Sequence, residues 1–222
     1  MDLFDRLRAA RPDAWAAYVE HPFVAGLGDG TLPEAAFRTY LVQDWLFLIQ
    51  FARAYALAVF KGRNLADMRR AARGVSAILD TEMDLHVRFA AGWGLSETDL
   101  EQADELPATT TYTRWVIDTG LRGDLLDLQV ALAPCIVGYA EIARALASRP
   151  GALAAANPYA PWIAEYSGDA YGEVAVAARA HLDELAAHAL TEARFEALAD
   201  VFARACRLEA DFWEMGWRVR MP

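Results

Sequence analysis

The sequence predicts an all-α protein, a single-domain bundle of about eight to ten helices. Apolar residues recur every three to four positions along nearly every long segment, which is helical spacing, and no alternating strand pattern persists. Glycines, prolines and capping residues mark where the segments begin and end. The 222 residues are 55% apolar, enough for a sizeable core, and no repeat or linker divides them, so we expect one domain over residues 1–222.

The first long helix should follow the capping box Thr31-Leu-Pro-Glu34 and run to about Lys61, where Gly62 can end it. Leu41, Trp45, Leu48 and Ala52 form its apolar face. A second long helix is expected over Leu65–Ala91, closed by Gly92, and Ser96-Glu-Thr-Asp99 resembles the cap of a short helix.

The later helices follow from the same signals. Gly120 should close one of them, and Arg149-Pro-Gly151 should end another. Pro158 and Pro161 open a short one. The expected ranges are 109–120, 124–147, 158–166, 169–188 and 191–217.

Composition excludes several classes of function. The formal net charge is −10, which argues against nucleic-acid binding because that needs a basic footprint. No uncharged apolar run reaches the roughly 20 residues of a membrane span, and the acidic amphipathic start resembles no signal peptide. Two cysteines make no disulfide framework and fit a reducing compartment. We therefore expect a cytoplasmic protein.

Cys135 is the most informative residue, because it follows Pro134 within the uncharged run 130–140. Proline removes a helical hydrogen bond and should kink the helix beside the thiol. Tyr139 lies four residues on, on the same helix face. The thiol is either a nucleophile or a small apolar core residue. Cys206 has no such surroundings and is expected to be structural.

Two carboxylates stand out in apolar surroundings. Asp44 is the only charged group in the run 40–51. If it faces inward it needs hydrogen-bond donors, which a ring carrying an amino group beside a ring nitrogen would supply. Glu209 shares a helix face with Phe212 and Trp213, where desolvation would raise its pKa and suit it to proton transfer. Tyr112 and Tyr166 are further candidates for a polar pocket.

Glu82 and His86 have the i, i+4 spacing of metal ligands on a helix. Further ligands could come from Glu141, His181, Asp183 and His188, although no strict motif joins them. The favoured interpretation is instead that Glu82 and His86 are a solvated or locally hydrogen-bonded pair on the helix.

Together these segments resemble the TenA or thiaminase II family, the aminopyrimidine aminohydrolases of thiamin salvage. The segments that carry the resemblance span most of the chain in consistent order. They are residues 40–48 around Asp44, Glu82-Met-Asp-Leu-His86, Tyr112-Thr-Arg, residues 134–142 around Cys135, residues 158–167 around Tyr166, and residues 208–215 around Glu209.

The resemblance implies a haem-oxygenase-like fold, a homotetramer and no cofactor or metal. It implies hydrolysis of 5-aminomethyl-4-amino-2-methylpyrimidine or of thiamin to the hydroxymethylpyrimidine. Cys135 would add to the ring, Glu209 would move protons, and Asp44 would hold the 4-amino group and a ring nitrogen. The pocket would be lined by Tyr112, Tyr139, Tyr166 and Phe212.

Phe47 departs from the family pattern, which commonly has tyrosine three residues after the aspartate. Losing that hydroxyl should change the hydrogen bonding of the catalytic glutamate. Two alternatives therefore stay open. One is a metal-dependent oxidase of the same fold, using Glu82, His86, Glu141, His181 and His188. The other is a protein that binds the pyrimidine without turning it over.

Overall fold

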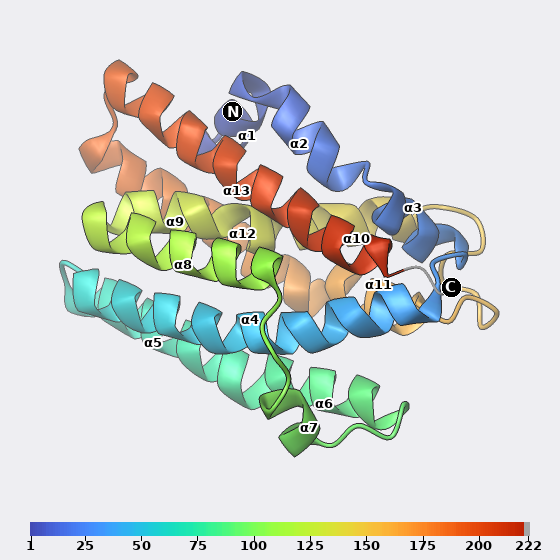
Figure 1. Cartoon of the computed structure of the whole chain (residues 1–222). Coiled ribbons are helices and arrows are strands. Elements are labelled where there is room, and N and C mark those ends of the chain that lie inside the picture. The colour runs from blue at the N-terminus through green and yellow to red at the C-terminus, as the bar shows by residue number, and fades with distance from the viewer. Residues whose placement is uncertain (220–222) are drawn as a thin grey trace.

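Helices α4 (Glu34–Lys61) and α13 (Glu192–Arg218) are the longest elements of the structure, a computed structural model that describes residues 1–219. They pack against each other near the centre of the bundle (Figure 1). No residue from 1 to 219 is in a β-strand, so the all-α prediction is confirmed. Residues 220–222 of the predicted domain lie outside the described residues.

The other helices surround this pair. The amino-terminal helices α1 to α3 lie against α13, and α5 runs along the opposite side of α4 (Figure 1). Their bounds are α1 Leu3–Ala10, α2 Pro12–Val19, α3 Pro22–Asp29, α5 Leu65–Ala77, α6 Met83–Ala91, α7 Glu97–Glu101, α8 Pro107–Arg122, α9 Leu125–Ala133, α10 Tyr139–Ala147, α11 Ala160–Ser167 and α12 Asp169–Ala189.

Two predicted long helices are continuous but contain a π-helical turn. Segment η1 (Ile78–Glu82) joins α5 to α6, and segment η2 (Pro134–Gly138) joins α9 to α10. At Pro134 the backbone thus relieves the missing hydrogen bond by widening into a π-turn. The segment Leu125–Ala147 is long and apolar enough to cross a membrane, but 72% of its most apolar window is buried inside the protein, as in a core helix.

Several predicted helix ends are confirmed. Gly62 caps α4, Gly92 caps α6, and Ser96 with Asp99 forms the capping box of α7. Each of these signals acts through bonds to neighbouring backbone, so local sequence suffices to find it.

Three predictions about the helices are wrong. The hydroxyl of Thr31 donates to Asp29 instead of capping α4, which begins after Pro33 without a side-chain cap. Helix α8 continues through Gly120 to Arg122, because Gly120 lies inside the helix where Leu57 and Leu128 leave no room for a Cβ atom. Thirteen α-helices lie within residues 1–219, more than the eight to ten expected. The short helices α1 to α3 were not predicted, and the π-helical segments divide two of the expected long helices.

Candidate active site

The predicted site residues come from six segments that converge inside the bundle. Asp44 and Phe47 lie on α4, Tyr112 on α8, and Cys135 on η2. Tyr139 begins α10, Tyr166 lies on α11, and Glu209 and Phe212 lie on α13. All except Cys135 are buried, and Cys135 is partly buried between the buried residues Pro134 and Ile136.

Glu209 is the acid of the site. The Tyr112 hydroxyl donates a 2.8 Å hydrogen bond to its Oε1 atom. Burial raises the pKa of Glu209 to about 8, with a further contribution from the charge of Asp44 and an opposing one from the Tyr112 hydrogen bond. Glu209 is therefore largely a neutral carboxylic acid at pH 7, as a proton donor requires.

Phe47 lies directly beside this pair. Its ring centroid is 5.0 Å from that of Tyr112 and 5.8 Å from that of Phe212. An aromatic wall thus surrounds Glu209, and Tyr112 is its only hydrogen-bond donor among the side chains of residues 1–219. Phe47, where the family commonly has tyrosine, thus packs against Tyr112, the residue that donates to Glu209.

Asp44 is held by two donors on one of its oxygens. Its Oδ2 atom accepts from the Tyr40 hydroxyl at 2.9 Å and lies 2.8 Å from Nε2 of His86. Within residues 1–219 no hydrogen bond to the other oxygen, Oδ1, is found. Asp44 thus keeps one oxygen for a ligand while the other fixes its orientation.

His86 forms a hydrogen bond with Asp44. Its Nδ1 atom lies 2.9 Å from the backbone oxygen of Glu82, which can only accept, so Nδ1 carries a hydrogen. With a hydrogen on Nδ1, the Nε2 atom donates to Asp44 as part of a charged ring. Burial opposes the charged ring, but the hydrogen bond and charge of Asp44 outweigh it and raise the pKa of His86.

Tyrosines 139 and 166 form the wall opposite Glu209. Their ring centroids are 5.2 Å apart, and the Tyr139 hydroxyl lies 3.5 Å from that of Tyr40. The Tyr166 hydroxyl donates to Oε1 of Glu82 at 3.3 Å. The tyrosines thus connect the Asp44 region with Glu82.

Cys135 lies close to three acids. Burial raises the pKa of its thiol well above the usual value, and the charges of Glu209, Glu82 and Asp44 raise it further. The resting thiol is therefore protonated. A reaction at its sulfur must remove that proton as the new bond forms, and carboxylates are the bases at hand.

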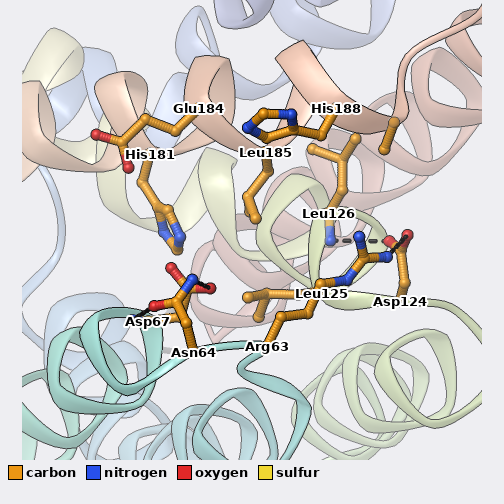
Figure 2. A pocket seen from close by; sticks show the side chains of 11 residues that line it. Arg63, Asn64, Asp67, Asp124, Leu125, Leu126, His181, Glu184, Leu185 and His188 are labelled. Atoms are coloured by element: carbon orange, nitrogen blue, oxygen red, sulfur yellow. Dashed lines mark hydrogen bonds and ion pairs between the residues drawn. The ribbon is translucent and has the colours of Figure 1, made fainter.

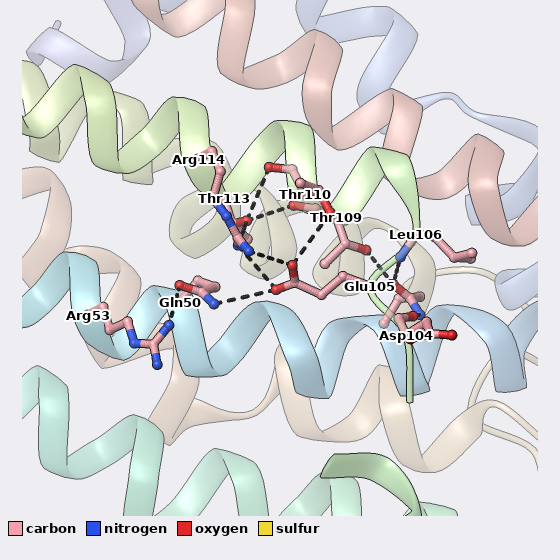
Figure 3. Close-up of polar contacts among 10 residues, drawn as sticks. Gln50, Arg53, Asp104, Glu105, Leu106, Thr109, Thr110, Thr113 and Arg114 are labelled. Atoms are coloured by element: carbon pink, nitrogen blue, oxygen red, sulfur yellow. Dashed lines mark hydrogen bonds and ion pairs between the residues drawn. The ribbon is translucent and has the colours of Figure 1, made fainter. Parts of the chain in front are cut away.

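Helix α8 is anchored to α4 beside the site. Gln43, next to Asp44, donates from Nε2 to the Asp104 carbonyl at 2.9 Å and accepts from the Thr109 hydroxyl. Two turns further along α4, Glu105 joins Arg114 to Gln50 (Figure 3). These contacts fix the position of Tyr112 relative to Asp44 and Phe47.

The candidate metal ligands do not come together. His181 and His188 line a separate pocket of about 310 Å³ between α5 and α12 (Figure 2). Glu141 pairs with Arg8 at 2.7 Å and with Arg179 at 3.1 Å. Within residues 1–219 no three His, Cys, Asp or Glu side chains are grouped as a metal site would need. The ligand set suggested for a metal-dependent oxidase is thus divided among distant places.

Sequence reasoning missed Tyr40 as a site residue, and it considered Glu82 and His86 only as metal ligands or as a local pair. Tyr40 and Asp44, like Glu82 and His86, are i, i+4 pairs. That spacing was a usable signal for the Tyr40 contact. The contact between His86 and Asp44 joins residues on separate helices, and no local pattern reveals it.

Known proteins resemble this chain over nearly its whole length. The sequence model of the TENA/THI-4/PQQC family matches residues 8–219. A curated relative from Halalkalibacterium halodurans, named aminopyrimidine aminohydrolase, is 38% identical, with 93% of this chain and 92% of the relative covered.

Solved structures agree with the fold. A protein from a Silicibacter species, described as a TenA family transcription regulator, is 40% identical with a TM-score of 0.92 and covers 99% of this chain and 97% of its own. A Shewanella denitrificans domain of unknown function with a haem-oxygenase-like fold has a TM-score of 0.75 at 14% identity, covering 97% and 92%. The haem-oxygenase-like fold is therefore confirmed. The chain belongs to the TENA/THI-4/PQQC family.

Proposed function

We propose that this protein is an aminopyrimidine aminohydrolase. It would hydrolyse 5-aminomethyl-4-amino-2-methylpyrimidine, or thiamin, to the hydroxymethylpyrimidine used in thiamin salvage. The name of the Halalkalibacterium halodurans relative supports this activity. The observation that carries the proposal is a pair of buried carboxyl groups in different surroundings. Within residues 1–219, Asp44 keeps one oxygen free while Tyr40 and His86 hold the other, and Glu209 accepts from Tyr112.

The reaction begins with addition of Cys135 to the pyrimidine ring. Asp44 Oδ1 accepts from the 4-amino group and so holds the ring in place. The thiol loses its proton to the Asp44 carboxylate as sulfur bonds to a ring carbon, and it takes that proton back when the sulfur is expelled. Aromaticity is lost, and the bond between the exocyclic carbon and the leaving group is weakened.

Glu209 then completes the exchange of substituents. Its carboxylic acid protonates the leaving amine, which departs. A water molecule adds to the exocyclic carbon and returns a proton to Glu209. Expulsion of the Cys135 sulfur restores the aromatic ring and releases the hydroxymethylpyrimidine.

The test of the nucleophile is the release of hydroxymethylpyrimidine and ammonia from the aminomethyl substrate. Cys135→Ser and Cys135→Ala should each lose activity by at least about 10³-fold, because covalent catalysis is removed. Cys206→Ser is the matched control, since Cys206 is buried on α13 away from any predicted role. Full activity in both Cys135 variants would exclude this mechanism.

Phe47→Tyr tests how Glu209 is tuned. The added hydroxyl should donate to the carboxyl group, favour its charged form and lower its pKa. The high-pH limb of the kcat profile should then move to lower pH, and kcat near pH 7 should change several-fold. Phe51→Tyr, one turn away on α4, is the control. An unchanged profile in Phe47→Tyr would show that the two groups do not interact.

A non-catalytic role is distinguished by the same substrates. The Silicibacter relative is described as a transcription regulator, and Phe47 is the feature of this chain that favours binding without turnover. A panel of thiamin, aminomethyl and formylamino pyrimidines should give turnover of at least one. Tight binding of the product with no turnover of any would favour the regulatory role.

The proposal extends to the state of the protein in the cell. We expect a cytoplasmic homotetramer that works without metal or cofactor, since the thiol supplies the nucleophile. Light scattering of the purified protein measures the assembly, and elemental analysis measures bound metal.

A further inference from the structure

Glu82, like Cys135, lies on a π-helical segment. Residues 1–219 contain two π-helical segments, η1 and η2. Such turns are rare and occur frequently at functional sites. Segment η2 carries Cys135, and η1 ends at Glu82. Glu82 has no role in the steps of the proposed reaction.

The surroundings of Glu82 leave it without a cation partner. Among residues 1–219 no arginine or lysine forms an ion pair with it, and its side chain contacts the Tyr166 hydroxyl. Burial raises the pKa of Glu82 to about 7. Asp44 on α4 and Glu165 on α11 raise it further, while His86 on α6 and the Tyr166 hydrogen bond lower it. Glu82 can therefore gain or lose a proton near neutrality.

A cavity of about 230 Å³ connects Glu82 with the surface. Its outer wall includes the exposed residues Thr81, Arg88 and Glu165. Its inner wall includes the buried Tyr166 and Ile136, the residue after Cys135. The remaining wall is mostly apolar and aromatic, with Tyr55 and Tyr171 facing Glu82 from α4 and α12. Glu82 thus lies in the same cavity wall as Tyr166 and is open to solvent through that cavity.

Addition of a thiol to a pyrimidine requires a second proton transfer. When the sulfur–carbon bond forms, the electron pair of a ring C=N bond moves onto the ring nitrogen. That nitrogen must gain a proton, which it returns when the sulfur is expelled. Glu209 is committed to the leaving group, so another acid has to serve the ring.

The Tyr112 hydroxyl donates to Glu209, and that of Tyr40 donates to Asp44, which leaves Tyr139 and Tyr166. Of these two, Tyr166 is the one with a hydrogen bond to a carboxyl group, that of Glu82. The Tyr166 hydroxyl donates to Glu82 while this group is charged, and it can accept from Glu82 once the carboxyl group is protonated, which frees its own hydrogen for the ring. Burial raises the pKa of Tyr166 well above its usual value, so the phenol alone is a weak acid. The phenol becomes an effective acid if a carboxylic acid donates a proton to its oxygen as its own proton departs. Glu82 is the carboxyl group in contact with Tyr166.

We propose that Glu82 is a positioning residue that supplies a proton to the Tyr166 hydroxyl as this hydroxyl protonates the ring nitrogen. The outer cavity then lets Glu82 exchange protons with solvent between turnovers. The inference rests on the proposed function, because it concerns the ring to which Cys135 adds.

The experiment compares kcat and KM against pH for wild type, Glu82→Gln, Tyr166→Phe and the double variant. Glu82→Gln should lower kcat about 10²-fold, the lower end for loss of general acid catalysis, with KM changed less than about threefold. The fall of kcat above about pH 7 should disappear, leaving the fall near pH 8 that belongs to Glu209. The double variant should be no slower than Tyr166→Phe, because the two groups act as one path.

Two controls separate this role from a structural one. Glu165→Gln removes an exposed carboxylate at the same cavity. It should leave kcat below about pH 7 unchanged and move the Glu82 limb only to slightly lower pH, because the charge of Glu165 raises the pKa of Glu82. Glu82→Asp, checked for folding by circular dichroism, should recover part of the activity and the pH limb that Glu82→Gln loses.

The outcomes are distinct from those that test the proposed function. The role of Glu82 would be overturned if Glu82→Gln kept the wild-type kcat and pH profile. It would also be overturned if the losses of the two single variants multiplied in the double variant. In both cases wild type would still turn over substrate, so the proposed function would stand. Absence of turnover by wild type would overturn the proposed function, and the role of Glu82 with it.

Discussion

Glu209 keeps its proton because the folded core excludes water from it. The carboxyl group has a pKa of about 8 in the folded protein against an ordinary value of 4.5. Between these two values the folded protein binds a proton that the unfolded chain releases. Raising the pH through this window therefore lowers the free energy of unfolding.

Glu209→Gln measures this contribution. Its amide can still accept from Tyr112 but has no proton to lose. From about pH 5 to about pH 8.5, wild type should lose on the order of 3 kcal/mol more free energy of unfolding than the variant. Urea denaturation at both pH values is the measurement. Glu82 is present in both proteins, so its titration cancels. Parallel losses would mean that Glu209 is already charged at low pH.

For single residues, the sequence predicted which residues form the site better than it predicted which residues they contact. Asp44, Cys135 and Glu209 stood out because a polar group in an apolar helix needs an explanation. His86 did not, since its partner Asp44 lies 42 positions away in the chain. Contacts between distant segments depend on how helices pack, which one sequence does not specify locally.

Pro134 determines how η2 presents the thiol. Proline has no N–H to bond to the Val130 carbonyl, and its own carbonyl accepts from the Tyr18 hydroxyl at 3.3 Å. Gly138 allows this approach, because a Cβ atom there would lie 2.5 Å from the Tyr18 ring. The π-turn is thus supported by Pro134, Tyr18 and Gly138 together.

Pro134→Ala should weaken catalysis without unfolding the protein. A restored N–H lets the turn close to α-helical geometry, which rotates Cys135 relative to the site. We expect kcat/KM to fall at least about tenfold, with an unchanged or higher melting temperature because a helix-breaking residue is lost. Pro161→Ala is the control, since Pro161 lies in the first turn of α11, where no N–H is needed. Full activity in Pro134→Ala would show that the π-turn is dispensable.

Element ends were predictable where the signal is a bond to nearby backbone, as at Gly62 and Ser96. Helix ends were not predictable where another group of the folded chain competes for the capping side chain. Thr31 and Glu34 match a capping box in sequence, yet Asp29 takes the Thr31 hydroxyl. The π-turns also escaped prediction as such, because proline predicts a disturbed helix and not the form of the disturbance.

One connected core extends through all the major helices. Phe202 on α13 illustrates this, because its ring packs against Phe4 of α1 at 5.5 Å and Trp15 of α2 at 6.0 Å. The amino-terminal helices are therefore part of the same packing as the site-bearing helix. This supports the proposal that residues 1–222 fold as one domain.

Phe202→Ala tests the unity of that core. The fully buried ring should cost about 3–5 kcal/mol of unfolding free energy when truncated. Unfolding followed by tryptophan fluorescence and by circular dichroism should remain one coincident transition. Leu153→Ala, at a side chain that is half exposed, should change stability by less than about 0.5 kcal/mol. Separate transitions in the two signals would mean that the amino-terminal helices unfold independently.

The two π-turns have a consequence for how such a site arises. Widening a turn accommodates one additional residue within a continuous helix, and each residue of an α-helix turns the chain by about 100°. A single inserted codon in a long helix can therefore re-aim the side chains at the widened turn, while the residues beyond it keep their faces and the helix keeps its caps. Cys135 and Glu82 both lie at such places. Chemistry in this bundle could thus be gained, or lost, through one-residue insertions and deletions that leave the fold intact.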